Sequence, residues 1–158
     1  MSLTKRIWQA TVDILAEECS DCEVIRCYDT LQNLEDLKGR ERPLISVALD
    51  GRDTEKVSRT QVQETYHFAA VIQKYIESQD EDGKQAEMDA LLPLITKIQD
   101  RFCHKTEVIS HDGEPPIQLK LISGESSTGE FYDVGYFTTA ELFICVCSIR
   151  IVVFRNMF

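Results

Sequence analysis

The chain has 158 residues, of which 43% are hydrophobic, and its 27 acidic and 17 basic residues give a net charge of −10. This size and hydrophobic content suit one core, so we expect a single domain over residues 1–158. The negative charge argues against unaided binding to nucleic acid. The chain also has no run of roughly eighteen uncharged apolar residues, the length that is needed to cross a membrane.

The N-terminal part of the chain predicts a helix, a strand and a short second helix. Apolar residues that recur at spacings of three and four predict an amphipathic helix over Thr4–Glu18, capped by Ser2 or by Thr4 itself. The β-branched and aromatic stretch Glu23–Tyr28 predicts a strand, and leucines at every third position then predict a short helix that Gly39 ends. No apolar leader precedes the first helix, so we expect a cytoplasmic protein.

Two further strands are predicted in the middle of the chain. Pro43 begins the first, whose apolar core runs to Leu49 and which the turn signal Asp50-Gly51 should stop. A much longer strand is predicted over Gln61–Ile76, because its residues alternate between two faces, one of which is polar in the first half.

A second long helix should follow these strands. Its wide apolar face extends from Ala86 to Phe102, and Asp82 or Gly83 should open it. Pro93 lies inside this pattern and removes a backbone hydrogen bond, so we expect a kink or a helix that starts afresh near it.

The last third of the chain predicts irregular structure and then one very long strand. After Cys103 we expect only a short strand over Ile117–Ile122. The stretch Thr139–Phe154 predicts a strand of about 50 Å, more than twice the usual length. We expect it to pair with Gln61–Ile76 as a ribbon that reaches past the core, and its distal half to be less buried in an isolated subunit than its composition warrants.

Together these elements predict an α+β fold. We expect a mixed, mainly antiparallel β-sheet with long strands and two main helices packed on one face.

The cysteines predict reduced thiols rather than a disulfide framework, because the chain is large and has no export signal. Cys19 and Cys22 form a C-x-x-C pair with Cys27 nearby, but this pair closes a helix, whereas a redox pair usually opens one. Cys145 and Cys147 make a poor second pair for zinc, since they lie two apart in an apolar strand. We therefore expect no metal and no cofactor.

No residue pattern in the chain predicts catalysis. His67, His104 and His111 are dispersed, and His67 should lie on the surface of a sheet. The loop Ser123–Gly129 has glycines and hydroxyls but lacks the lysine and the following helix of a phosphate-binding loop, so a solvated loop is favoured. We expect a protein that is not an enzyme.

The order of the elements resembles the small tail terminator and minor tail proteins of long-tailed bacteriophages. The resemblance covers most of the chain and consists of an N-terminal amphipathic helix, the Pro-led strand Pro43–Leu49, the strand Gln61–Ile76, the helical pattern Ala-x-x-x-Ala-Leu-Leu-x-Leu-Ile over Ala86–Ile95, and a closing strand after Tyr136-Phe137.

This resemblance implies a structural role. It implies a hexameric ring of identical subunits that caps the tail tube, with tail-tube and head-connector proteins as partners, in the host cytoplasm during assembly and then in the virion. Acidic residues would suit a lumen through which DNA passes. Candidate interaction residues are Asp80, Glu81, Asp82, Ser123, Gly124, Ser127 and Gly129.

Two alternatives belong to other functional classes. One is a small cytoplasmic ligand-binding or enzymatic domain with a pocket between the sheet and the Ser123–Gly129 loop, which would use Cys103, His104 and His111. The other is a monomeric adaptor that binds a partner strand along an open edge of the sheet.

Overall fold

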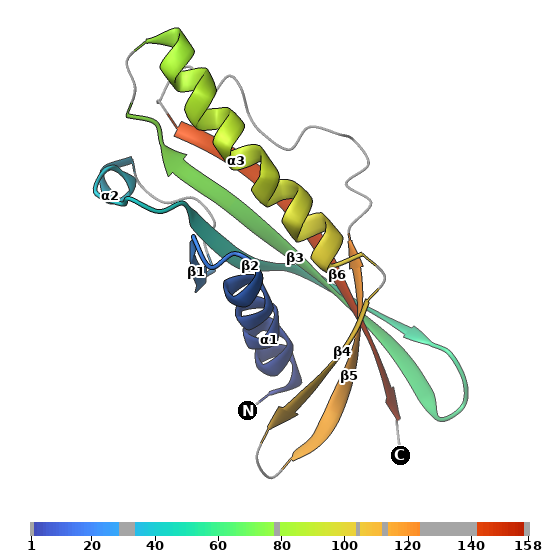
Figure 1. Ribbon diagram of the computed structural model, residues 1–158. Coiled ribbons are helices and arrows are strands. Elements are labelled where there is room, and N and C mark those ends of the chain that lie inside the picture. The colour runs from blue at the N-terminus through green and yellow to red at the C-terminus, as the bar shows by residue number, and fades with distance from the viewer. Residues whose placement is uncertain are drawn as a thin grey trace.

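A computed structural model describes residues 2–28, 34–77, 80–103, 105–111, 114–123 and 142–156. The fold is α+β, as predicted, with six described strands in one curled sheet of order β1-β2-β3-β6-β5-β4 (Figure 1). The elements are α1 (Leu3–Glu18), β1 (Glu23–Arg26), α2 (Leu34–Lys38), β2 (Leu44–Lys56), β3 (Gln61–Tyr75), α3 (Glu81–Arg101), β4 (Lys105–His111), β5 (Glu114–Ser123) and β6 (Leu142–Asn156).

The longest strands, β3 and β6, form the centre of the sheet. They pair antiparallel without a register shift, from Gln61 opposite Asn156 to Tyr75 opposite Leu142. This confirms the predicted pairing of the two long segments. On their outer sides β3 pairs with β2 and β6 with β5, and only the short β1, beside β2, lies parallel to its neighbour.

Both main helices cover the same face of the sheet, which confirms the predicted layering. Alternation along the strands brings one apolar row of each strand to this face, where it meets the apolar stripes of α1 and α3. The Trp8 indole N–H also donates a hydrogen bond to the Val47 carbonyl at 2.9 Å, which fixes α1 against β2. The core here includes Ile7, Leu15, Val47, Tyr66, Phe68, Ile95, Ile98, Phe102, Leu121, Phe143 and Ile151.

A smaller apolar cluster lies on the opposite face. Leu37 of the short helix α2 packs there on Leu44, Val71, Leu142 and Ile144. The central strands are therefore buried on both faces where the end of β3 pairs with the start of β6.

The strand that begins at Leu44 does not stop at Asp50-Gly51, so that prediction was wrong. The register shifts between Leu49 and Gly51, which leaves Asp50 without a partner in β3, and β2 then continues to Lys56. A bulge of this kind absorbs one extra residue within a continuing strand. The real hairpin turn follows Lys56, where the N–H groups of Val57 and Ser58 both donate to the Gln61 carbonyl.

The irregular structure predicted directly after Cys103 is wrong for residues 105–111, which form β4. The second long helix, α3, runs through Pro93 as one helix, so the predicted fresh start is wrong, whereas the predicted kink stays a prediction. Asp89 and Pro93 are both exposed, so the Asp89 carbonyl that Pro93 leaves without its helical donor lies on the solvent side.

Candidate functional site

The three predicted acidic residues lie at the start of α3. Asp80 is the N-cap, and its carboxylate accepts a hydrogen bond from the Gly83 N–H. Glu81 and Asp82 occupy the first turn, where negative charge is favoured by the helix dipole. All three are exposed. The structure thus gives them a role in stabilising the helix, and an interaction role stays a prediction.

The predicted residues of the Ser–Gly loop are almost all beyond the described part of the chain. Ser123 is the last residue of β5 and lies opposite Ile149 of β6. Gly124, Ser127 and Gly129 lie outside the described residues, so their interaction role stays a prediction.

Two of the three residues of the alternative pocket lie far apart. Cys103 is exposed and precedes β4, whereas His111 ends it, and a seven-residue strand spans about 20 Å. His104 lies outside the described residues. His67 lies in β3, and its Nε2 is 2.8 Å from Oδ2 of the exposed Asp53 on β2. This places His67 on the sheet surface, as predicted.

Cysteines from both ends of the chain meet in the core on the helix-covered face. Cys19, Cys22, Cys145 and Cys147 all belong to this core, and all are free thiols. The pKa of Cys22 is raised from 9.0 to about 11, mainly by burial and then by the neighbouring Cys19. A thiol with such a pKa stays protonated and unreactive at neutral pH. The described residues hold no group of three or more His, Cys, Asp or Glu side chains arranged to bind a metal.

A buried carboxylate on β3 is a feature that the sequence analysis missed. Glu64 is only 2% exposed, accepts a hydrogen bond from the Tyr66 hydroxyl at 2.8 Å, and pairs with Arg155 Nη2 at 2.8 Å. The pKa of Tyr66 is raised, first by burial and then by its bond to the Glu64 carboxylate. The sequence did contain a signal for it. Glu64 stands between Val62 and Tyr66 in the row of alternate residues that leads to Phe68, a row that faces the core.

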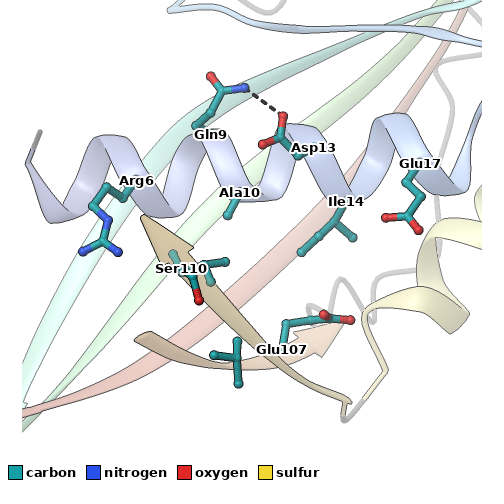
Figure 2. Close-up of a pocket in the computed structure, with 10 residues that line it drawn as sticks. Arg6, Gln9, Ala10, Asp13, Ile14, Glu17, Glu107 and Ser110 are labelled. Atoms are coloured by element: carbon teal, nitrogen blue, oxygen red, sulfur yellow. Dashed lines mark hydrogen bonds between the residues drawn. The ribbon is translucent and has the colours of Figure 1, made fainter. Parts of the chain in front are cut away.

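A groove with polar and apolar walls lies between α1 and β4. It has a volume of about 440 Å³, within the usual range of binding pockets. One side of α1 forms one wall, and the β4 residues Glu107 to Ser110 form the other (Figure 2). Ala10 and Ile14 supply the apolar part of the helical wall.

Charge is distributed unevenly along this α1–β4 groove. Arg6 lies at the N-terminal end of α1, whereas Asp13 and Glu17 lie toward its C-terminal end, with Glu107 across from them (Figure 2). Glu107 is paired with Arg101. The last turn of α1 contains no basic residue, so the negative end of the helix dipole adds to the two α1 carboxylates.

β4 is an edge strand of the described sheet, because only β5 pairs with it there. Val108 in its middle is 62% exposed. Another open edge is that of β2 beyond its contact with β1, and it carries the charged residues Asp50, Arg52, Asp53, Glu55 and Lys56. Charged side chains protect an edge against pairing with another chain. By this criterion the β2 edge is well protected and the middle of β4 is not.

The groove was missed because β4 was missed. The helical wall could be predicted, because its residues recur at helical spacing along one side of α1: Arg6, Ala10, Asp13, Ile14 and Glu17. The sequence does not indicate which strand faces that side.

Comparison with protein-family models and with curated proteins finds no match for this chain. Among the described residues, no helix is long and apolar enough to cross a membrane.

Proposed function

We propose that this chain is a structural virion protein of a bacteriophage or prophage, of the tail terminator or head–tail joining type. It forms a homo-oligomeric ring, with six subunits expected, that caps the tail tube and contacts tail-tube and head-connector proteins. It works without a cofactor and without catalysis, first in the host cytoplasm and then in the virion. The order of the elements, which resembles that of tail terminators, supports this proposal.

One structural observation carries the proposal, a three-stranded arm at one end of the sheet. The arm consists of residues 51–56 of β2, 61–65 of β3 and 153–156 of β6, and it projects away from both main helices (Figure 1). The described pairing of β5 with β6 ends at Val152, so along the arm both outer strands have open edges in the described part of the sheet. Because charged side chains protect the β2 edge from pairing, we take the β6 edge and the exposed Phe154 as the surface on which a neighbouring subunit packs.

The two faces of the arm differ in burial. On the helix-covered side Val62, Glu64 and Val153 are buried within the single chain, which is more than the sequence led us to expect. Apolar side chains of the arm are exposed at other positions. Val57 at the turn is 51% exposed, and Phe154, on the side away from the helices, is 47% exposed. A neighbouring subunit that covers Phe154 would remove an exposed aromatic ring from water.

The charge is compatible with a ring around DNA. With a net charge of −10, the chain does not attract phosphate, and an acidic lumen lets DNA pass without adhesion. The exposed start of α3, with Asp80, Glu81 and Asp82, is the segment we assign to the lumen or to an outer face.

Light scattering and negative-stain electron microscopy test the proposal. At high protein concentration in physiological salt we expect particles with six times the mass of one chain and rings in the images. Because some rings form only on their tube, the same measurement is repeated with purified tail tubes of the matching phage. A protein that stays monomeric alone and does not bind the tube ends would overturn the proposal.

The enzymatic alternative has less support. It needs Cys103, His104 and His111 in one pocket, and Cys103 and His111 lie at opposite ends of β4.

A further inference from the structure

We propose that the α1–β4 groove docks an extended segment of a different protein. The segment pairs with β4 as an additional strand and places basic side chains against Asp13 and Glu17. This inference does not rest on the proposed ring, because it concerns the opposite edge of the sheet from β2 and its arm.

The free side of β4 supplies the backbone partners for such a strand. An edge strand presents a row of N–H and C=O groups, and an added strand satisfies them while its alternate side chains point to the two faces. Val108, exposed on this edge, gives the incoming strand an apolar contact on the side away from α1, since Glu107 and Ile109 share the helix-covered face with their partners Leu119 and Ile117.

The helical wall decides which side chains the strand must carry. Every second residue of a strand paired to β4 points toward α1, where it meets Asp13 and Glu17 beyond the apolar Ala10 and Ile14. Glu107 is paired with Arg101, and Asp13 accepts a hydrogen bond from the uncharged Gln9 at 3.0 Å (Figure 2), so the negative charges of Asp13 and Glu17 remain to be matched by a cation. Lysine or arginine at the alternate positions matches these carboxylates and the negative end of the α1 dipole.

The same charges argue against a second copy of this chain as the occupant. Each chain carries a net charge of −10, and its open β2 edge contains three acids and two bases between Asp50 and Lys56. A β2 edge brought to the groove would place like charges together, which costs free energy. A basic segment of another protein avoids this cost.

A binding experiment with defined peptides tests the proposal. The probe is a fluorescent seven-residue peptide, as long as β4, that alternates lysine with threonine. Two control peptides carry glutamate in place of lysine, or proline at the centre, which removes a backbone donor. Fluorescence anisotropy measures the dissociation constant, and hydrogen exchange reports which amides become protected. We expect the lysine peptide to bind, both controls to bind more weakly, and the amides of β4 to be protected.

Charge reversal at the groove gives the sharpest comparison. The double variant Asp13→Lys with Glu17→Lys should weaken binding of the lysine peptide about tenfold, because two attractive contacts become repulsive. Both residues are exposed and lysine is a good helix former, so α1 should fold normally, as circular dichroism would verify. The matched control, Glu41→Lys with Asp36→Lys, changes the net charge by the same amount at exposed sites that do not line the groove.

Each contrary result overturns the inference. Equal weakening by the two double variants would mean that only net charge matters. Protection of β2 rather than β4 would place the binding at the other edge. Equal binding of the proline peptide would exclude strand pairing, and no binding at millimolar peptide would exclude the site.

Discussion

The Tyr66 hydroxyl donates a hydrogen bond to the Glu64 carboxylate, two residues earlier on the same strand, at 2.8 Å. Both side chains lie on the helix-covered face of the central strand β3 and are almost fully buried, and Arg155 of β6 completes the carboxylate's contacts. Removing this buried carboxylate alone should destabilise the fold, because its two partners would then lose their hydrogen-bond acceptor.

Replacing Glu64 with alanine should lower the free energy of unfolding by about 3 kcal/mol. The change leaves the buried Tyr66 hydroxyl without this acceptor and opens a small cavity. Urea unfolding followed by the fluorescence of the single tryptophan, Trp8, measures the effect. Glu55→Ala, at an exposed site on β2, serves as the control and should change stability by less than about 0.5 kcal/mol. Equal effects of the two substitutions would contradict the buried pairing.

The cap of α3 can be separated from any interaction role of its charge. Asp80→Ala should cost about 1 kcal/mol, whereas Asp80→Asn keeps an oxygen for the Gly83 N–H and should cost much less. Thermal unfolding measures both variants. If asparagine is as destabilising as alanine, the hydrogen bond of the cap is not what Asp80 contributes.

The raised pKa of Cys22 predicts a loss of stability at alkaline pH. In the unfolded chain this thiol ionises near 9.0, but in the folded protein it stays protonated up to about 11. Its contribution is therefore complete below pH 9 and is lost as the pH rises toward 11. Between pH 8 and pH 10.5 the native protein should lose about 2 kcal/mol more than Cys22→Ala does.

Denaturant unfolding under reducing conditions measures this difference at each pH. The comparison uses the change with pH and not the absolute stability, because the alanine also leaves a cavity. Cys103→Ala, which removes an exposed thiol, is the control and should follow the native pH profile. Parallel profiles for Cys22→Ala and the native protein would show that Cys22 ionises normally in the folded state.

Phe154 tests the arm as a subunit contact. Phe154→Asp should shift the oligomer toward smaller species by at least about tenfold in dissociation constant, since it places a charge in an apolar contact. Val146 is a matched control on the same strand and the same face, and it is exposed to a similar extent, 43% against 47%. Sedimentation velocity compares Phe154→Asp with Val146→Asp. An equal response would place the subunit contact elsewhere.

The sequence was informative where apolar periodicity was long. The pairing of β3 with β6 could be predicted because both segments are about equally long and apolar, and the layering of α1 and α3 followed from their apolar stripes. It was misleading at Asp50-Gly51, a typical turn signal, because the sheet absorbs Asp50 as a bulge and turns later at residues without glycine or proline.

The groove could not be predicted because its strand wall has a weak pattern. β4 reads Lys-Thr-Glu-Val-Ile-Ser-His, with only two adjacent apolar residues, and it forms because β5 pairs beside it. Tertiary context of this kind overrides local propensity. Which side of α1 faces that strand is likewise decided by the curl of the whole sheet.

The central pair of the sheet also sets the order in which the protein can fold on the ribosome. β3 pairs with β2 as soon as both are made, but its other edge waits for β6, which follows only after α3, β4 and β5. Contacts between such distant segments form slowly. Until β6 emerges, β3 has one unpaired edge, so the completion of this sheet is a late step and the nascent chain is most prone to aggregation before it.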